Sequence, residues 1–460
     1  MMNVTFYLNK DNRSIYCWIL IKILYVYLTV NILEGLWYQG YGSYGIEFNL
    51  RKEIIGLFCF IILCIFYSRF GNESNLSTTL VHTLFLIYYI PLNSSYSIHN
   101  LPTLYFIEIN LYFVLIMIFC LYKISYADLY MGKIRFLPAF HISKPPVHFL
   151  NENIKIMLIL ICIICIIYKI VYNGFSFSLS VFSDTLYEDR AEYVDSLNSM
   201  DGTASGYIVA LILNLSKYAI PISLYYALKY KKLLMGILSV IAMVSLFSII
   251  AGKSTILFAI IVLGLYWCEK HFSIINFNKY LDMVLLSFLV LCFVIYKLMN
   301  DYFMYFIFIR RALFLPSWLN YLYYDFFCEH SKVFWSQSTF ILQRLIPSNY
   351  DTSPIAIISE VYFKNMVPSP NTGLFADAYI NLGILGLIVY PFLIGELVKF
   401  SDTLYCRYGV ALGVLVGLRL AIHLTNVQLL RTDFVLSYIL LTILIWVLSR
   451  IKICVLNKGA

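Results

Sequence analysis

Twelve apolar segments, most of them long enough for a membrane-spanning helix, constrain this chain more than any other feature. A helix needs about 20 mostly apolar residues to cross a bilayer. The chain has 460 residues, and only 13% of them are charged, against roughly 25% in soluble domains. The segments are residues 15–33, 54–67, 80–90, 104–121, 154–172, 207–228, 233–250, 256–268, 281–299, 378–398, 409–424 and 434–448. We therefore expect one all-α, polytopic membrane domain over residues 1–460, with about 12 transmembrane helices.

The distribution of basic residues orients these segments. Lys and Arg collect in the cytoplasmic loops of membrane proteins. With the N-terminus inside, the inside loops and termini hold about 17 Lys and Arg, and the short outside loops hold about five. Both termini are therefore expected to be cytoplasmic, and the net charge of +8 records this topology. Outside the apolar segments there is no basic stripe with interleaved aromatic residues, so a nucleic-acid partner is not indicated.

This orientation places two long loops on the outer face, at residues 173–205 and 300–376. Packed helices are usually joined by about 2–8 residues, and much longer loops often carry function. In the first loop Arg190 is the one basic residue among six acidic residues. It is interpreted either as part of a local ion pair or as a guanidinium that binds phosphate through two parallel hydrogen bonds.

The second loop combines aromatic residues with charges that suit a membrane surface. Arg310, Arg311 and Pro316 interrupt an aromatic stretch that is too polar to span, which is typical of an interfacial segment. Two adjacent arginines at that depth suit a lipid-linked diphosphate, with ordinary headgroup anchoring as the alternative. Where the loop ends, Asp377 and Asn381 lie one turn apart on a helix that enters the membrane. Polar groups there are costly unless they are paired or used.

Other charged residues fall within the apolar segments or at their ends. Lys22, Glu108, Lys169 and Lys217 are interpreted as packed pairs or as side chains that reach toward the membrane surface. Arg419 and His423 are one turn apart, and both a buried polar pair and the wall of a cavity remain open for them.

Three stretches on the outer face resemble the Wzy-type O-antigen and oligosaccharide repeat-unit polymerases. They are TLYEDRAEY with the following Gly206 and Tyr207, RRALFLPSWLNYLYYDFF with the following FWSQS, and NTGLFADAYINLGILG. They occur in the order expected for that family, and the hydropathy pattern is similar over nearly the whole chain.

The resemblance implies a fold like the membrane-embedded C-class glycosyltransferases, in a bacterial inner membrane, with the active face in the periplasm. The implied reaction joins polyprenyl-diphosphate-linked oligosaccharide repeat units into O-antigen or capsular polysaccharide, without a cofactor or a metal ion. The implied partners are the lipid-linked oligosaccharide, the bilayer, a chain-length regulator and a flippase.

We assign roles to the outer-face residues for such a reaction. The expected diphosphate clamp consists of Arg190, Arg310 and Arg311, since preorganised cations stabilise developing negative charge. The expected base that deprotonates the acceptor hydroxyl is Asp377, then Asp325, then His330. The candidate contacts to sugar are Asn381 and the aromatic residues Tyr323, Tyr324, Tyr379 and Trp335, with ordinary aromatic packing as the alternative for these four rings.

Two other functions are compatible with the same sequence. An O-antigen ligase would transfer the finished glycan to the lipid A core and also has about twelve spans and a large periplasmic loop. A flippase for the lipid-linked unit would place its polar residues near the middle of the membrane. The polar residues singled out here lie at the outer face, so a transporter ranks last.

Overall fold

The structure is a computed structural model in which nearly all described residues are helical. It describes residues 12–34, 36, 44–68, 74–124, 136–138, 152–174, 204–250, 253–337, 340–364, 372–431 and 434–450. The chain forms two compact units. The first comprises Met1–His141, Ile275–Lys399 and Ala421–Gln428, and the second comprises Ile142–Ile274, Phe400–Leu420 and Leu429–Ala460.

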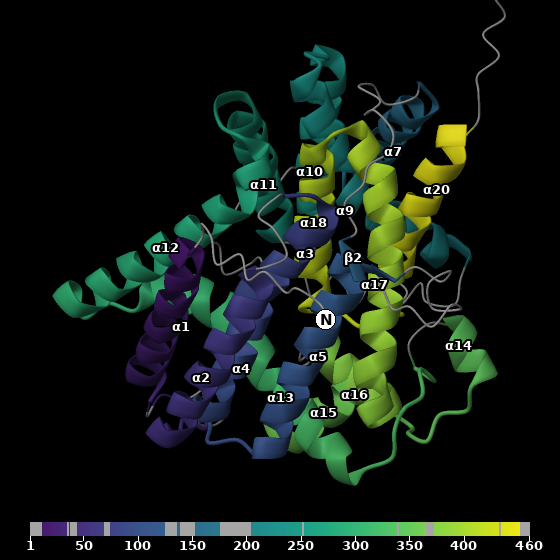
Figure 1. Cartoon of the computed structure of the whole chain (residues 1–460). Helices are drawn as coiled ribbons and strands as arrows, with labels where there is room; N and C mark the ends of the chain where they lie inside the picture. The colour runs from purple at the N-terminus through teal and green to yellow at the C-terminus, as the bar shows by residue number, and fades with distance from the viewer. Residues whose placement is uncertain are drawn as a thin grey trace, which may run out of the picture. The chain divides into compact units, whose positions relative to one another are not determined.

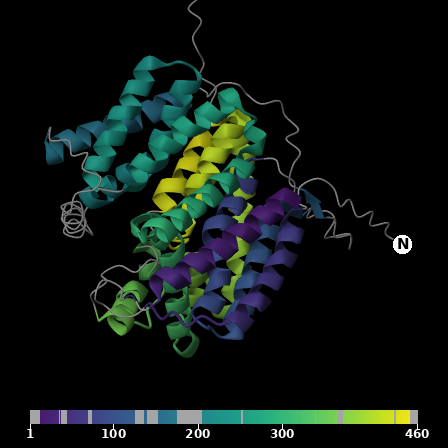
Figure 2. The same cartoon turned by 90° about the vertical axis from the view of Figure 1, so that its left-hand side faces the viewer.

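The first unit contains the N-terminal helices and the long loop that follows α12 (Figure 1). Its elements are α1 (Asn12–Leu33), α2 (Leu50–Tyr67), α3 (Leu76–Leu84), η2 (Phe85–Tyr89), α4 (Ile90–Ile98), α5 (Thr103–Leu121), α12 (Phe277–Met299), η4 (Tyr305–Phe314), α13 (Leu315–Glu329), α14 (Phe340–Leu345), α15 (Pro354–Phe363), α16 (Leu374–Leu382), η5 (Gly383–Leu385) and the first part of α17 (Gly386–Tyr405). A short antiparallel pair, β1 (Tyr122–Ile124) and β2 (Phe136–Pro138), follows α5. Figure 2 shows α1, α2 and α4 packed side by side.

The second unit is built around α9, which packs against α7, α10 and α11. Its elements are α7 (Glu152–Asn173), α9 (Ala204–Lys229), α10 (Leu233–Ile250), α11 (Lys253–His271), η6 (Cys406–Tyr408), most of α18 (Val410–Leu424), η7 (Val435–Ile439) and α20 (Leu440–Arg450). The short η3 (Ile274–Asn276) joins this unit to α12.

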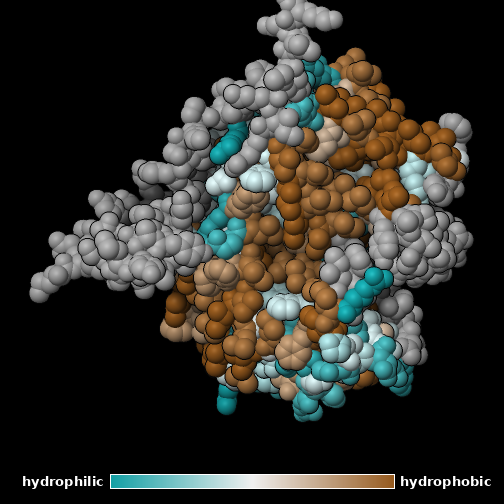
Figure 3. All heavy atoms as spheres, turned by 90° about the vertical axis from the view of Figure 1, so that its right-hand side faces the viewer, coloured by the Kyte–Doolittle hydropathy of each residue, from teal (hydrophilic) through white to brown (hydrophobic). Residues whose placement is uncertain are grey.

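All twelve predicted apolar segments lie in helices or in runs of consecutive helices. By length and composition, six stretches in the described part of the chain could cross a membrane. They are Ser14–Leu33, Thr103–Leu121, Glu152–Val171, Ile208–Lys229, Phe277–Met299 and Leu374–Tyr405. The outward side of α12 is apolar, with Leu291, Val294 and Leu298 exposed at helical spacing. On the face drawn in Figure 3, hydrophobic side chains dominate. These features indicate a helical protein embedded in a membrane.

The apolar segment at residues 378–398 is divided by a break. Gly383 ends α16 with a φ of 58°, a left-handed backbone conformation that favours glycine. The chain then turns so tightly that a Cβ atom on Gly386 would collide with the backbone carbonyl group of Ala378. As a result α16 folds against the start of α17, and α16 alone, with nine residues, is too short to cross a bilayer.

Candidate active site

The start of α16 is anchored by polar side chains from distant parts of the first unit. The backbone N–H of Phe375 donates to the Tyr88 hydroxyl at 2.7 Å, and that of Ala376 donates to Oδ1 of Asn320 at 2.9 Å. The Tyr88 hydroxyl in turn donates to the same Asn320 oxygen at 2.8 Å. The first N–H groups of a helix have no partner within the helix. Here they are paired with side chains, so the helix can begin inside the protein.

Gly373 permits this close approach. Its φ is 72°, and a Cβ atom at this position would lie only 2.6 Å from Nδ2 of Asn320. The depth of the helix start follows from Tyr112, whose hydroxyl donates to the Leu374 carbonyl at 3.2 Å. Tyr112 lies nine residues after Thr103, which is about 14 Å along α5. The helix α16 therefore begins well inside the first unit, level with the middle of α5.

Asp377 and Asn381 are buried in a hydrogen-bonded network with two aromatic residues. The Asn381 amide donates to Oδ1 of Asp377 at 2.8 Å and to the Tyr390 hydroxyl at 3.1 Å. The backbone N–H of Trp335 donates to Oδ1 of Asn381 at 2.6 Å, and its indole N–H donates to Tyr390 at 2.7 Å. The predicted placement of Asp377 and Asn381 on one helical face is confirmed. Because Asp377 is 0% exposed, this network mainly fixes the loop that holds Trp335 against α16 and α17.

A second cluster lies where α5, α13 and α16 meet. The Tyr324 ring is 4.5 Å from the Tyr379 ring and 4.7 Å from the Tyr105 ring, measured between centroids. The Tyr379 hydroxyl is 3.2 Å from the Cys328 thiol. The structure thus brings together Tyr324 and Tyr379, two of the residues expected to contact sugar.

A carboxylate and an ammonium group complete this cluster. Glu108 is buried on α5, five residues or about 8 Å from the start of the helix. Its carboxyl group interacts electrostatically with Lys332 and is influenced by Tyr324, while its Oε2 atom has no hydrogen-bond partner among the described residues. Lys332 lies with Nζ 4.3 Å from the centre of the Tyr379 ring and interacts electrostatically with Glu108. We call Glu108, Tyr324, Cys328, Lys332 and Tyr379 the Glu108 cluster.

The surroundings of the Glu108 cluster alter its acid–base chemistry. Partial burial lowers the pKa of Lys332, and the charges of Cys328 and Glu108 oppose this shift. Burial raises the pKa of Tyr324, with further contributions from the Cys328 hydrogen bond and the Glu108 charge. The cluster therefore offers a carboxyl group, a cation and protonated phenols within one partly buried site. Such a combination can accept a proton from a hydroxyl and stabilise negative charge nearby.

Asp325 and His330 lie on the exposed side of α13 and its C-terminal end. The Asp325 carboxylate accepts hydrogen bonds from Tyr321 at 3.2 Å and from Tyr362 at 2.7 Å. His330 stacks on Phe326 at 3.9 Å, and its Nδ1 atom is 2.7 Å from the Phe326 carbonyl oxygen. The structure thus gives both residues partners other than the Asp377 network.

The two adjacent arginines point to different surroundings. Arg310 is buried in the π-helical segment η4, where its Nη1 atom donates to the Tyr44 hydroxyl at 2.6 Å and its guanidinium lies 4.8 Å from the Phe306 ring. Arg311 is exposed. Consecutive residues of a helix point in different directions, which explains the separation. Only Arg311 is therefore presented to a ligand at the surface, while Arg190 lies outside the described residues.

Glu108 and Lys332 were not among the residues expected to be catalytic. The signal for Glu108 was present, because a carboxylate within an apolar segment is costly and often functional. Nothing in the sequence distinguishes Lys332 from Lys364, the other lysine of the long loop. Tyr323, another expected sugar contact, is fully buried on α13 and has a packing role.

Within the described ranges, no three His, Cys, Asp or Glu side chains are grouped so that they could hold a metal ion. Comparison of the chain with protein-family models, with curated proteins and with solved structures gave no match.

Proposed function

We propose that this protein is a membrane glycosyltransferase that joins polyprenyl-diphosphate-linked oligosaccharide repeat units, as Wzy-type polymerases do. In this proposal it has twelve spans and a C-class glycosyltransferase-like fold, and it lies in a bacterial inner membrane with both termini in the cytoplasm. The observation that carries the proposal is the Glu108 cluster, in which a buried carboxyl group lies beside tyrosines and a lysine and has one oxygen without a hydrogen-bond partner in the part of the chain that the structure describes.

The cluster suits the chemistry of this transfer. The oxygen of the acceptor hydroxyl would form a bond to the anomeric carbon of the donor glycan, while the bond from that carbon to the diphosphate breaks. Glu108 would accept the hydroxyl proton, and Lys332 would stabilise the charge on the departing diphosphate. The exposed Arg311 lies 16 residues before Phe327, whose carbonyl accepts a hydrogen bond from Lys332, so Arg311 would contact a more distant part of the lipid-linked substrates. Tyr324 and Tyr379 would pack against sugar rings. Asp377 would then be a positioning residue, since its network holds Trp335 in place.

Contacts among the predicted outer loops support the placement of the reaction at the outer face of the membrane. The N–H of Glu47, between the first two apolar segments, donates to the carbonyl of Ile98 at 2.8 Å. Tyr44 in the same region accepts the hydrogen bond from Arg310 in the long loop. Segments expected on one side of the membrane thus contact one another.

Contacts among the predicted cytoplasmic helix ends are also consistent with the expected topology. Trp18, His82 and Asp282 lie near the ends at which three segments are expected to leave the cytoplasm. The Trp18 indole N–H donates to Asp282 at 2.7 Å, and His82 Nε2 lies 2.9 Å from the same oxygen. These three ends thus contact one another, as expected for ends that lie on one side of the membrane.

The test is complementation of a deletion strain with the Glu108→Gln variant, followed by a gel of its surface lipopolysaccharide. Gln keeps the shape and an acceptor oxygen but cannot take a proton at this step. We expect normal amounts of the variant in the membrane and glycan limited to one repeat unit. Glu360→Gln is the matched control, because Glu360 is an exposed carboxylate of the same unit, and it should restore the full ladder. A full ladder from Glu108→Gln would refute the assignment of the base.

The deletion strain also separates the proposed function from its alternatives. Loss of a polymerase leaves lipid A core that carries a single repeat unit. Bare core with polymer still attached to the polyprenyl carrier would identify a ligase. Repeat units trapped on the cytoplasmic side would identify a flippase.

A further inference from the structure

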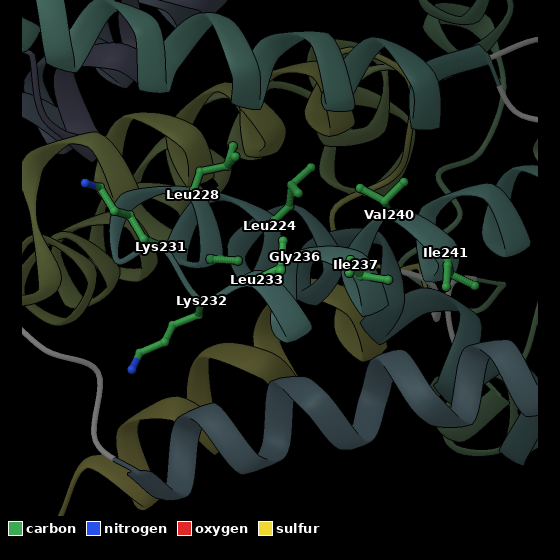
Figure 4. Close-up of a pocket in the computed structure, with 10 residues that line it drawn as sticks. Leu224, Leu228, Lys231, Lys232, Leu233, Gly236, Ile237, Val240 and Ile241 are labelled. Carbon is green, nitrogen blue, oxygen red and sulfur yellow. The ribbon is translucent and has the colours of Figure 1, made fainter.

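A groove in the second unit lies between the end of α9 and the start of α10. Its volume is about 520 Å³, within the range of roughly 300–1,000 Å³ that is usual for small-molecule sites. It is lined by the apolar side chains of Leu224, Leu228, Ile237, Val240 and Ile241. Gly236, which has no side chain, also lines it. Figure 4 shows Lys231 and Lys232 at one end of this α9–α10 groove and Val240 and Ile241 toward the other.

The two lysines differ from the neighbouring lysine on α9. Lys229 forms an ion pair with Glu269 at 2.6 Å, and Glu269 also accepts a hydrogen bond from Tyr225. Lys231 and Lys232 are exposed, and neither has an acidic partner among the residues that the structure describes. The mouth of the groove thus has two positive charges, without acidic partners in the described ranges, directly beside an apolar interior.

The backbone places the two lysines at the end of α9. Lys231 has a φ of 55°, the left-handed conformation with which helices commonly end, and the backbone N–H of Lys232 donates to the Ala227 carbonyl at 2.9 Å. The two lysines therefore lie at the turn between α9 and α10, where they line one end of the groove.

We propose that the α9–α10 groove binds an anionic phospholipid. One acyl chain occupies the apolar interior, and the phosphate of the headgroup pairs with Lys231 and Lys232. An apolar slot with cations only at its mouth matches a molecule that is anionic at one end and hydrocarbon at the other. Basic pockets between membrane helices on the cytoplasmic side recognise anionic headgroups in the same way. The site is independent of the proposed transferase activity.

The test uses the full-length protein purified in detergent, with phosphatidylglycerol and phosphatidylcholine of identical acyl chains as probes. Native mass spectrometry counts the bound lipid, and the thermal unfolding midpoint reports stabilisation by the ligand. We expect wild-type protein to bind phosphatidylglycerol more tightly than phosphatidylcholine. Lys231→Gln and Lys232→Gln should each weaken that binding roughly fivefold, the attraction expected between one lysine and an anionic lipid surface. Lys270→Gln, an exposed lysine of the same unit, should have no effect.

A second variant tests the acyl chain separately from the charge. A Cβ atom on Gly236 would lie 3.6 Å from that of Ala227, an ordinary contact, so Gly236→Leu should fold and fill the groove. This variant should lose bound lipid of both classes without a lower unfolding midpoint in the absence of lipid. Equal binding of the two lipids by wild-type protein, or an unchanged preference in the Lys231→Gln and Lys232→Gln variants, would overturn the proposal. Retention of lipid by Gly236→Leu would overturn the placement of the acyl chain.

Discussion

Asp282 holds together four helices of the first unit, and its removal should be costly. Its carboxylate accepts the Trp18 indole N–H at 2.7 Å and lies 2.9 Å from Nε2 of His82. The other ring nitrogen of His82 is 3.1 Å from the Tyr67 hydroxyl. Trp18, Tyr67, His82 and Asp282 belong to α1, α2, α3 and α12, and all four side chains are buried.

The magnitude follows from what Asp282→Ala leaves behind. The Trp18 N–H and the His82 nitrogen would be buried without partners, and each orphaned polar group costs about 1–3 kcal/mol. One kcal/mol shifts the unfolding midpoint of a large domain by roughly 2–4 °C, so the variant should lose on the order of 10 °C.

Thermal unfolding of purified protein in detergent measures this loss. Asp282→Asn keeps one acceptor oxygen for Trp18 and should lose less than Asp282→Ala. Glu360→Ala removes an exposed carboxylate of the same unit and should unfold within about 2 °C of wild type, as surface substitutions usually do. If Asp282→Ala unfolded at the same temperature as Glu360→Ala, the network would contribute nothing to stability and the reasoning would be wrong.

Two further predictions concern the basic residues of the long loop. Burial lowers the pKa of Lys332, so at pH values just below 10.5 the native state binds fewer protons than the unfolded state. The contribution of Lys332 to the free energy of unfolding should therefore rise with pH. The difference in unfolding midpoint between wild type and Lys332→Met should therefore shift in favour of wild type from pH 7 to pH 10; a constant difference would contradict this. Arg310→Ala should lower the unfolding midpoint because Arg310 is buried against Tyr44, whereas Arg311→Ala should leave the midpoint unchanged and shorten the surface glycan. Equal midpoints for the two arginine variants would show that burial does not separate their roles.

The helices were predictable because their signal is local. Each apolar segment can be recognised from its own residues, and the pairing of Asp377 with Asn381 follows from the i, i+4 geometry of a helix. The same geometry separates Arg310 from Arg311, so their expected joint role as a clamp already conflicted with helical periodicity.

The Glu108 cluster was not predictable in the same way. Glu108, Tyr324 and Tyr379 come from three helices, and no pattern within any one helix shows that they meet. The break at Gly383 was also hidden, because the hydropathy of the segment continues across it. Both features depend on tertiary contacts, which a single sequence without related sequences does not reveal.

The anchoring of α16 has a consequence for how the protein is made. Tyr88 and Phe375, which share a hydrogen bond, are separated by 287 positions along the chain. At a synthesis rate of about 5–20 residues per second, the ribosome needs roughly 15–60 s to pass from one to the other. During that interval the newly inserted N-terminal helices contain a tyrosine hydroxyl without its final partner, and α16 is too short to insert as an independent span. The first unit can therefore complete its folding only late in translation. Until then, lipid, water or a membrane chaperone must contact the polar groups of its N-terminal half.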